Sequence, residues 1–467
     1  MKKKSIAYIL LALSLVTTTS CESMVDGLNK NPNQVGIDDI DAGLYVNTPE
    51  LALVSINRGL YSRLSALWTG QLYGVNQLPL QYYNYQVTEN TFNFDGFQSV
   101  ITQAETIQQL APNNSFYQGI TRVMEAMLFG TYASLYGDIP CSEVGTDVES
   151  PKFDGQLEVF ATVQQLLDKS IEYLSATSHP VFKQDYLYNG SVQKWLECAY
   201  TLKARYYMIT REYDKAYQAA QHGISSDENS MYFRPVNDGL TANKNNYYTA
   251  NSIYQGLGTV NLEGKQVFMF DLMDERNNAK TDETARKAYY NIVPSDPLNA
   301  QGISGKLEKE PIVTYSENLL ILAEAGARTV GLAEGLKYLN QQRAFLEGGG
   351  CANATFISQP HRYQAYDAAD FAKGGLMNTT ELEPIRALLK EIIIERYVSG
   401  FTTFTPFDDA RRLRGSGESD IAIDIPLNTS SASQQPERFY YPEAEMMSNE
   451  NAPKEPGLYE PTPVNRK

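Results

Sequence analysis

The stretch Gln193–Ile224 constrains the fold more than any other part of the chain. It reads QKWLECAYTLKARYYMITREYDKAYQAAQHGI, and this residue order predicts two helices that hinge near Thr210. Trp195 stands at the start, and the small residues Ala199 and Ala204 follow it. Because small side chains let two helices approach closely, the stretch predicts a tightly packed helix pair.

This layout resembles a tetratricopeptide unit, and weaker versions of it run through Val159–Leu174 and Glu317–Ala344. In most proteins with such units the helix pairs serve as a scaffold. We therefore predict a mainly α fold, with tetratricopeptide-like helix pairs at approximately 116–225 and 314–412. Long loops and a few short strands would carry the ligand surface.

The N-terminus has the pattern of an export signal. Three lysines at positions 2–4 precede the apolar stretch Ile6–Val16, which is too short to cross a bilayer as a stable helix. Small residues follow, and then Cys21. An ordinary cleaved signal would leave Cys21 as a chance cysteine, whereas a bacterial lipobox would make it the acylated first residue of the mature chain. We favour lipidation because Glu22–Gln34 is polar and tether-like, although Thr18 stands where an aliphatic residue is usual.

The chain is accordingly expected to divide into three parts. Residues 1–20 form a lipoprotein signal peptide and 21–45 a lipidated tether. Residues 46–467 form a single folded body with an irregular, loop-rich part.

Composition argues against several classes of protein. The 467 residues carry a formal net charge of -16, whereas nucleic-acid binding normally needs a basic surface. The three histidines are isolated, and the sequence contains no G-x-S-x-G, H-E-x-x-H or Walker A pattern. We expect no catalytic residues, no cofactor and no metal site. Beyond Cys21, we expect Cys141, Cys198 and Cys351 to be buried free thiols, although one pair could form a disulfide.

Segments rich in Tyr, Asn and Gln supply candidate ligand contacts. Leu67–Glu89, Arg234–Tyr254 and Gly415–Arg438 show little helical periodicity and predict long loops, which in compact proteins are often functional. Sugar rings present apolar C–H faces and a rim of hydroxyls, so a sugar site combines exposed aromatic planes with amide groups. The candidate ligand-binding residues are Trp68, Tyr73, Asn76, Tyr82, Tyr83, Tyr85, Tyr247 and Tyr248.

Trp68 is the first of these candidates. The chain has only two tryptophans, and Trp195 belongs to a predicted helix pair, whereas Trp68 has a loop-like context. A role in core packing is equally compatible with the sequence, because Trp is highly buried on average. If the segment around Tyr82 and Tyr83 is extended, at least one of these two side chains faces solvent.

Four stretches in register resemble one family. Together with the lipobox and Asn31-Pro-Asn33, their order and spacing are similar to those of the SusD/RagB family over essentially the whole mature chain. The stretches are Tyr136–Glu143, Thr314–Ala325, Glu391–Tyr397 leading into Phe407–Arg412, and Arg438–Glu445.

The resemblance implies an outer-membrane lipoprotein of Bacteroidetes that captures nutrients at the cell surface, as in polysaccharide utilisation. Its implied partner is a SusC-like TonB-dependent outer-membrane barrel, over which the lipoprotein acts as a hinged lid. The sequence departs from the family pattern after Glu395-Arg396, where Ser399-Gly-Phe stands in place of the usual acidic residue. The sequence therefore does not predict which salt bridges form there.

The shared motifs have plausible structural roles. Gly137 and Pro140 should end the helix that precedes them. Glu324 and Arg328 form an i, i+4 pair, and the Asp and Arg residues of Phe407–Arg412 invite bidentate ion pairs. We favour a fold-maintaining role for this cluster over binding of an anionic ligand.

The leading hypothesis is a glycan-binding lipoprotein that delivers oligosaccharides to the transporter without cleaving them. The alternative keeps the fold and uptake role but binds peptides through main-chain hydrogen bonds. A glycan-processing enzyme would need two carboxylates roughly 5–10 Å apart around a cleft. A purely structural scaffold would lack an exposed aromatic cluster.

Overall fold

The computed structural model describes residues 41–176, 180–236, 244–294, 302–350 and 352–466. Within these ranges the chain is mainly helical with a few two- to four-residue strands, which confirms the predicted fold class. Cys21, Cys351, the predicted signal peptide and most of the predicted tether lie outside the described residues. In the described ranges no helix combines the length and apolar character that crossing a membrane requires.

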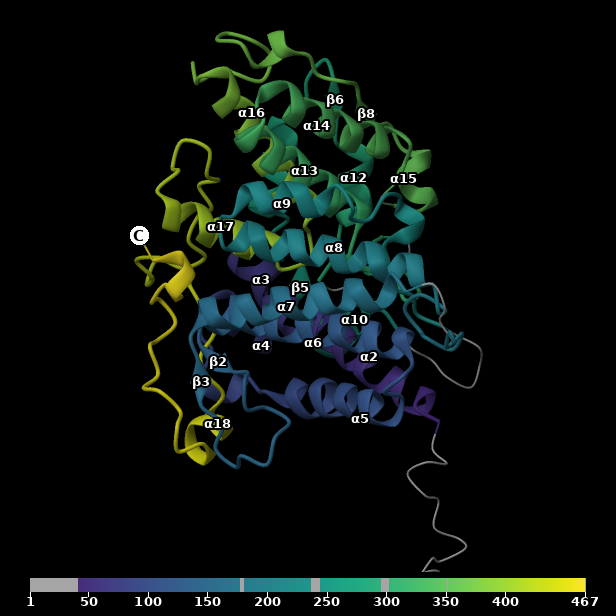
Figure 1. The fold of residues 1–467 in the computed structure, drawn as a ribbon. Helices are drawn as coiled ribbons and strands as arrows, with labels where there is room; N and C mark the ends of the chain where they lie inside the picture. Colours follow the sequence, from purple (N-terminus) through teal and green to yellow (C-terminus); the bar gives the residue numbers. More distant parts are fainter. Residues whose placement is uncertain (1–40, 177–179, 237–243, 295–301, 351, 467) are drawn as a thin grey trace, which may run out of the picture.

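Sequential helices pack in pairs to form a scaffold. Helix α6 packs on α7, α8 on α9 and α13 on α14, and contacts of α7 with α8 and of α9 with α13 join the pairs into one stack (Figure 1). This confirms the predicted helix pairs. The scaffold helices are α6 (Ser115–Tyr136), α7 (Gln156–Leu174), α8 (Val192–Ile209), α9 (Tyr213–Ala220), α13 (Tyr315–Thr329), α14 (Leu332–Glu347), α16 (Pro384–Ser399) and α17 (Thr405–Ser416).

Glycines allow the scaffold helices to approach closely. A Cβ atom on Gly130 of α6 would lie 2.2 Å from the ring of Tyr206 on α8. A Cβ atom on Gly335 of α14 would lie 2.5 Å from the Cβ of Ala327 on α13. Such separations are far inside van der Waals contact, so the close packing of these helices depends on the missing side chains.

Helix α6 ends where the sequence predicts. Its last residue is Tyr136, and Gly137 follows with a φ of 90°, a conformation that glycine adopts without steric cost. At the other end, the side chain of Asn114 accepts hydrogen bonds from the backbone N–H groups of Phe116 and Tyr117. Nearly all residues between these caps are buried, so α6 is the central helix of the core.

A second set of helices covers α6. They bury apolar side chains such as Leu64 and Val100 in the core that α6 shares. These helices are α2 (Gly43–Arg58), α3 (Leu60–Trp68), the π-helix η3 (Phe97–Thr102) and α5 (Gln103–Leu110).

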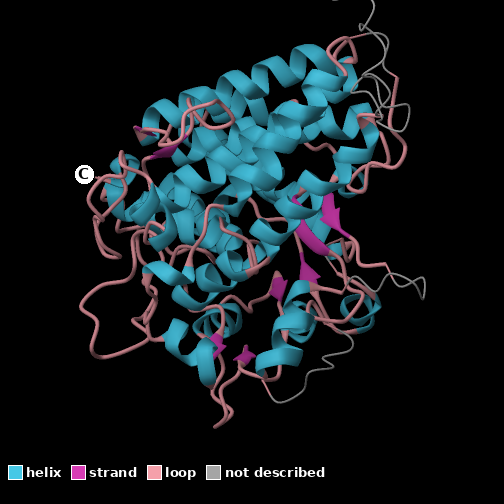
Figure 2. Cartoon of the chain, turned by 90° about the horizontal axis from the view of Figure 1, so that it is seen from below, coloured by secondary structure: helices cyan, strands magenta, loops and turns pink. Residues whose placement is uncertain are grey.

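Short strands and helices make up the rest of the chain, and Figure 2 shows the strands as small ladders beside the helical stack. The antiparallel strand pairs are β1 (Tyr73–Gly74) with β5 (Leu257–Gly258), β2 (Ile139–Pro140) with β3 (Phe153–Asp154), β4 (Met231–Phe233) with β7 (Glu310–Val313), and β6 (Thr281–Asp282) with β8 (Arg362–Tyr363). The short helices are α4 (Gln77–Tyr83), η2 (Glu89–Thr91), η4 (Asp227–Asn229), α10 (Asn246–Tyr254), α11 (Phe268–Glu275), α12 (Thr284–Tyr290), α15 (Ala354–Ser358), η5 (Ala368–Phe371), α18 (Glu443–Ser448) and η6 (Pro463–Asn465).

Two predicted long loops are partly regular, so the prediction of a loop is wrong where helices and strands form, and residues 237–243 lie outside the described ranges. Leu67–Glu89 contains the end of α3, strand β1 and helix α4, and Arg234–Tyr254 contains α10. Pro79 lies in the first turn of α4, where its missing N–H costs no helical hydrogen bond. Gly415–Arg438 is irregular beyond the end of α17, as predicted.

The predicted ion pairs form inside the protein rather than on its surface. Glu324 is fully buried and accepts hydrogen bonds from Arg328 (2.9 Å) and Arg412 (2.8 Å). Burial alone would raise the pKa of Glu324, but Arg412, Arg328 and Arg396 lower it to about 2. Arg412 also reaches Asp409 at 2.9 Å, so this network holds α13, α16 and α17 together and offers no open anion site.

The departure at Ser399 is accommodated by a hydrogen bond. The Ser399 hydroxyl donates to the carboxylate of Glu395 at 2.6 Å, and Arg276 and Arg286 contact the same carboxylate at 2.6 and 2.7 Å. These buried arginines hold the pKa of Glu395 well below its usual range. The serine therefore completes the network that the missing acidic residue left open.

Cys141 and Cys198 are buried free thiols, as predicted. Burial raises the pKa of each to about 12, so both stay protonated and unreactive at neutral pH.

Candidate functional site

A tight turn connects strand β1 to helix α4. The backbone N–H of Val75 donates to the carbonyl oxygen of Gly256 at 2.8 Å, next to the pairing of β1 with β5. A Cβ atom on Gly74 would lie 1.8 Å from the carbonyl oxygen of Pro79. Only glycine fits there, and the chain folds back closely onto α4 as a result.

Three partly exposed tyrosines, Tyr73, Tyr82 and Tyr83, lie on this turn and helix. The ring centroids of Tyr73 and Tyr83 are 5.4 Å apart with their planes inclined by 48°. Burial raises the pKa of both residues, so their hydroxyls stay neutral across the physiological range. The tyrosines thus offer ring surface and hydroxyl groups that the protein already holds in place.

Asn76 and Tyr248 connect this region to helix α10. The amide nitrogen of Asn76 donates to the carbonyl oxygen of Gln255 at 3.3 Å, and Gln255 caps the end of α10 with a φ of 48°. At the start of α10, the side chain of Asn245 accepts from the N–H groups of Tyr247 (2.9 Å) and Tyr248 (3.0 Å). This cap fixes the rotation of α10 and leaves Tyr248 partly exposed.

Tyr247, the neighbour of Tyr248, points into the core and is only 2% exposed. The guanidinium carbon of Arg58 lies 5.4 Å from its ring centroid, and its hydroxyl contacts Ser62. The prediction that Tyr247 contacts ligand is therefore wrong for this structure, because the ring has no open face.

Trp68 is also a core residue. It ends helix α3, is 1% exposed, and packs edge-on against Phe407 and Phe439. Its indole N–H donates to the carbonyl oxygen of Tyr82 at 2.9 Å. The expected loop-borne platform is wrong, and the core-packing alternative is what the structure shows.

Tyr85 is buried as well, and with it the structure reveals a residue that the sequence did not single out. The Tyr85 hydroxyl accepts from the backbone N–H of Asn428 at 3.0 Å. The side-chain amide of Asn428 donates to the carbonyl oxygens of Leu67 (2.8 Å) and Tyr83 (2.9 Å), which ties α3 to the end of α4. No local pattern marks Asn428, because its partners are more than three hundred positions away in the chain.

Exposed apolar and amide side chains also lie on α4 and α10. Leu78, Leu80 and Ile253 are 39%, 40% and 64% exposed. Gln77 and Gln81 are exposed on α4 among these apolar groups. Apolar planes bordered by amides are the chemistry that a sugar ring requires.

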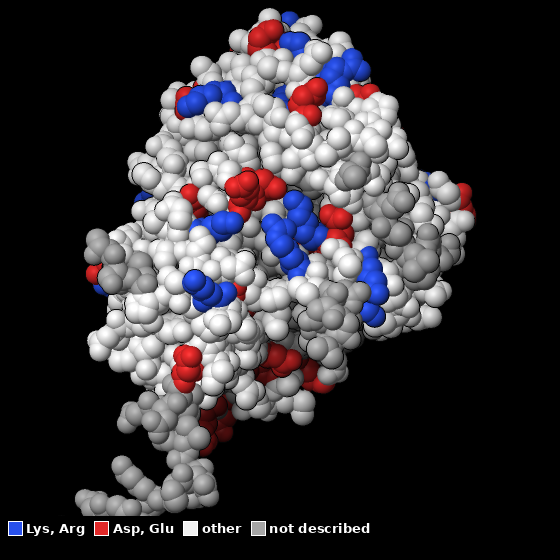
Figure 3. All heavy atoms as spheres, turned by 90° about the vertical axis from the view of Figure 1, so that its right-hand side faces the viewer, with Lys and Arg blue, Asp and Glu red and all other residues white. Residues whose placement is uncertain are grey.

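Two segments build this region and neither carries a charged side chain. Leu64–Thr88 and Asn245–Leu262 contain no Asp, Glu, His, Lys or Arg, although the whole chain has a formal net charge of -16. We call β1, α4, α10 and their exposed side chains the neutral surface. In contrast, on the face shown in Figure 3 basic side chains gather near the centre with acidic ones beside them.

The SusD-like family model, described as "Starch-binding associating with outer membrane", matches residues 44–442. The chain belongs to the SusD-like family. A SusD/RagB family protein from Bacteroides thetaiotaomicron has 19% identity and a TM-score of 0.67, covering 91% of this chain and 99% of its own. A chitin-binding SusD homolog from Flavobacterium johnsoniae has 14% identity and a TM-score of 0.63, covering 91% of this chain and 97% of its own. At these identities the likeness shows a shared fold, and no curated protein matches the sequence.

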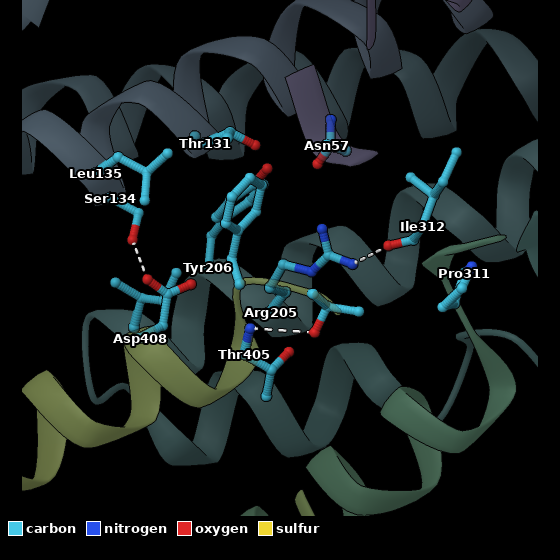
Figure 4. A pocket seen from close by; sticks show the side chains of 14 residues that line it. Asn57, Thr131, Ser134, Leu135, Arg205, Tyr206, Pro311, Ile312, Thr405 and Asp408 are labelled. Atoms are coloured by element: carbon cyan, nitrogen blue, oxygen red, sulfur yellow. Dashed lines mark hydrogen bonds between the residues drawn. The ribbon is translucent and has the colours of Figure 1, made fainter. Parts of the chain in front are cut away.

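This SusD-like protein also has an internal cavity, between α2, α6, α8, β7 and α17 (Figure 4). Ser134 donates to Asp408 at 2.5 Å, and Arg205 holds Glu317 through two hydrogen bonds of 2.6 and 2.7 Å. Arg411 pairs with the same Asp408 carboxylate. Asp408 and the neighbouring Glu317 are thus each paired with an arginine.

The structure thus sorts the predicted site residues of this SusD-like protein into two groups. Tyr73, Asn76, Tyr82, Tyr83 and Tyr248 are partly exposed on or beside β1, α4 and α10, whereas Trp68, Tyr85 and Tyr247 are buried in the core. Within the described residues, no group of three His, Cys, Asp or Glu side chains is arranged to hold a metal ion.

Proposed function

We propose that this SusD-like protein binds neutral oligosaccharides on the neutral surface. The observation that carries the proposal is the absence of charged residues from Leu64–Thr88 and Asn245–Leu262 in a strongly acidic chain. A charged ligand would need an opposite charge to offset its desolvation, whereas an uncharged sugar needs ring faces and amide groups. The family description names starch, and one similar structure is a chitin-binding homolog, which supports a glycan as the ligand.

The protein acts in nutrient uptake at the outer membrane. An acylated Cys21 anchors it at the cell surface, and it passes oligosaccharides to a SusC-like TonB-dependent barrel, over which it closes as a lid. The family description, which names the outer membrane, and the N-terminal lysine–apolar–cysteine pattern support this role.

The protein binds its ligand without cleaving it. Glycoside hydrolysis needs two carboxyl groups flanking the bond. The segments that form the neutral surface contain no Asp or Glu at all, so they supply neither the acid nor the nucleophile.

Calorimetric titration of the protein from Glu22 onward tests this function. Maltoheptaose and chitohexaose are the sugar probes, and a mixture of tryptic peptides is the competing class. We expect one of the sugars to bind and Tyr82→Ala to weaken its binding about fivefold, because one stacking contact contributes about 1 kcal/mol. Tyr200→Ala, a partly exposed tyrosine on α8, is the matched control and should leave binding unchanged.

Each other outcome contradicts a part of the proposal. Binding of peptides but not sugars would establish the peptide alternative. Shortened sugars after incubation would contradict the non-catalytic role. Equal losses in Tyr82→Ala and Tyr200→Ala would show that the neutral surface is not the site.

A further inference from the structure

A second tyrosine-lined groove lies on the scaffold. Helices α9 and α14 form its walls and α13 forms its floor, and its volume is about 470 Å³. This volume is within the range of small-molecule sites. The groove shares no lining residue with the neutral surface, and Figure 1 shows α9, α13 and α14 in the upper half of the molecule, with α4 and α10 in the lower half.

Three partly exposed tyrosines line this groove, one from each helix: Tyr217, Tyr315 and Tyr338. The ring centroids of Tyr217 and Tyr338 are 6.4 Å apart, with their planes at 72°. The two rings therefore meet edge to face and form a corner, and the Lys337 ammonium lies 4.4 Å from the Tyr338 ring centroid on one side of that ring. Gly326 on the floor permits this arrangement, since a Cβ atom there would lie 3.1 Å from the Tyr217 ring.

One end of the groove is closed by a polar bridge. The Tyr217 hydroxyl donates to the carboxylate of Glu334 at 2.8 Å, and the Lys337 ammonium contacts the same carboxylate at 2.8 Å. Lys337 and Tyr217 lower the pKa of Glu334, so the carboxylate is ionised and its charge is offset by the lysine. The bridge supplies fixed acceptors and donors next to the tyrosine corner.

The rest of the groove is polar at the rim and apolar at the bottom. Gln221 and Gln341 are exposed on opposite walls, and Leu319 and Leu322 lie on the floor. A groove that is open, shallow and bordered by amides suits a ligand with apolar faces and many hydroxyls. It suits a purely apolar ligand poorly, because the polar rim would lose its water without gaining partners.

We propose that this groove is a second saccharide-binding site, which takes a short stretch of the same glycan chain. The choice of ligand class depends on the proposed function, whereas the location does not. A long glycan that reaches both sites would bind more tightly than either site alone would allow, through the raised effective concentration of its second segment. Short sugars would occupy the two sites independently.

The test uses calorimetric stoichiometry with maltoheptaose and chitohexaose on the protein from Glu22 onward. We expect two sugars per chain in the wild type and one per chain in Tyr338→Ala. Tyr338→Phe keeps the ring and should restore the second site. Tyr82→Ala should weaken binding at the neutral surface only, and the double variant should be impaired at both sites.

The outcomes separate the two proposals. One sugar per chain in the wild type, bound equally well by Tyr338→Ala but more weakly by Tyr82→Ala, overturns the groove and keeps the neutral surface. Loss in Tyr338→Ala alone keeps the groove and overturns the neutral surface. Should Tyr338→Ala fail to fold, Gln341→Trp fills the groove from an exposed position, and an unchanged stoichiometry in that variant overturns the proposal. Groove-specific binding of tryptic peptides instead of sugars also overturns it.

Discussion

The indole N–H of Trp68 donates a 2.9 Å hydrogen bond to the main-chain carbonyl of Tyr82. The only tryptophan outside the helix pairs is thus a support beneath the neutral surface. It fixes the position of α4 from below, while the side chains of that helix meet solvent.

Replacing Trp68 should therefore affect stability before binding. Trp68→Phe removes the donor to Tyr82 and part of the packing against Phe407, and we expect the free energy of unfolding to fall by about 1–3 kcal/mol. Urea denaturation measures this loss, and sugar binding to the folded variant should change little. Abolished binding with unchanged stability would instead show that the ring contacts ligand.

The free energy of unfolding should fall as pH rises from about 5 to 8, because Glu125 loses its proton in the folded state over this range. Burial raises its pKa to about 7, with Gln108 donating to it at 2.8 Å. The folded state therefore retains a proton between pH 4.5 and 7 that the unfolded state has lost, and this favours folding at the acidic end of the window. A shift of this size corresponds to about 3 kcal/mol at most.

Thermal unfolding of the wild type and of Glu125→Gln across this pH range checks the assignment. The difference in unfolding free energy between wild type and variant should decrease steadily toward pH 8. A difference that stays constant would mean that another group is responsible.

Removing Glu324 should be among the most destabilising single changes in the chain. Glu324→Gln leaves the buried Arg396 and Arg412 to share Asp409 as their remaining counter-charge, and we expect the free energy of unfolding to fall by about 3–5 kcal/mol. Glu172→Gln is the control, because its pair with Lys169 is largely exposed and should contribute little to stability. Comparable losses for the two variants in urea denaturation would contradict the structural role of the network.

The Glu324 network also predicts that the protein loses stability at low pH. The lowered pKa of about 2 means that its contribution is present above the ordinary glutamate value and is lost as pH falls toward 2. The wild type should therefore lose more stability than Glu324→Gln between pH 4.5 and 2.

Replacing Gly130 by alanine should destabilise the protein, although it adds only a methyl group. In Gly130→Ala the added carbon would meet the Tyr206 ring, so α6 and α8 would have to separate, at a cost of about 1–3 kcal/mol. Gly348→Ala is the matched control, since its added carbon would meet ordinary contacts at 3.5 Å. Melting temperatures of the two variants give the comparison, and equal values would contradict close packing at Gly130.

Features set by neighbours in the sequence were predictable. The helix pair around Thr210, the stop at Gly137 and the pair of Glu324 with Arg328 all depend on residues within a few turns of one another, and the structure has each of them. Their physical causes are helical periodicity, a left-handed glycine and i, i+4 spacing, which act locally.

The exposure of individual aromatic residues was not predictable in this way. Trp68 is buried by Phe407 and Phe439, more than three hundred positions away, so its loop-like surroundings in the sequence were misleading. Tyr247 is buried and its neighbour Tyr248 is partly exposed, because the cap at Asn245 sets the rotation of α10. Composition singled out segments rich in tyrosine and amide residues, but tertiary packing decided which of their rings stay exposed.

The lack of charge on Leu64–Thr88 and Asn245–Leu262 has a consequence for the medium in which the protein works. A neutral ligand held by these segments displaces no bound counterions, so its affinity should be nearly the same in dilute and in concentrated salt. The strongly acidic remainder of the molecule keeps the protein dispersed without affecting that contact. If the proposed function holds, changes in the ionic strength of the surroundings should leave capture of the ligand unchanged.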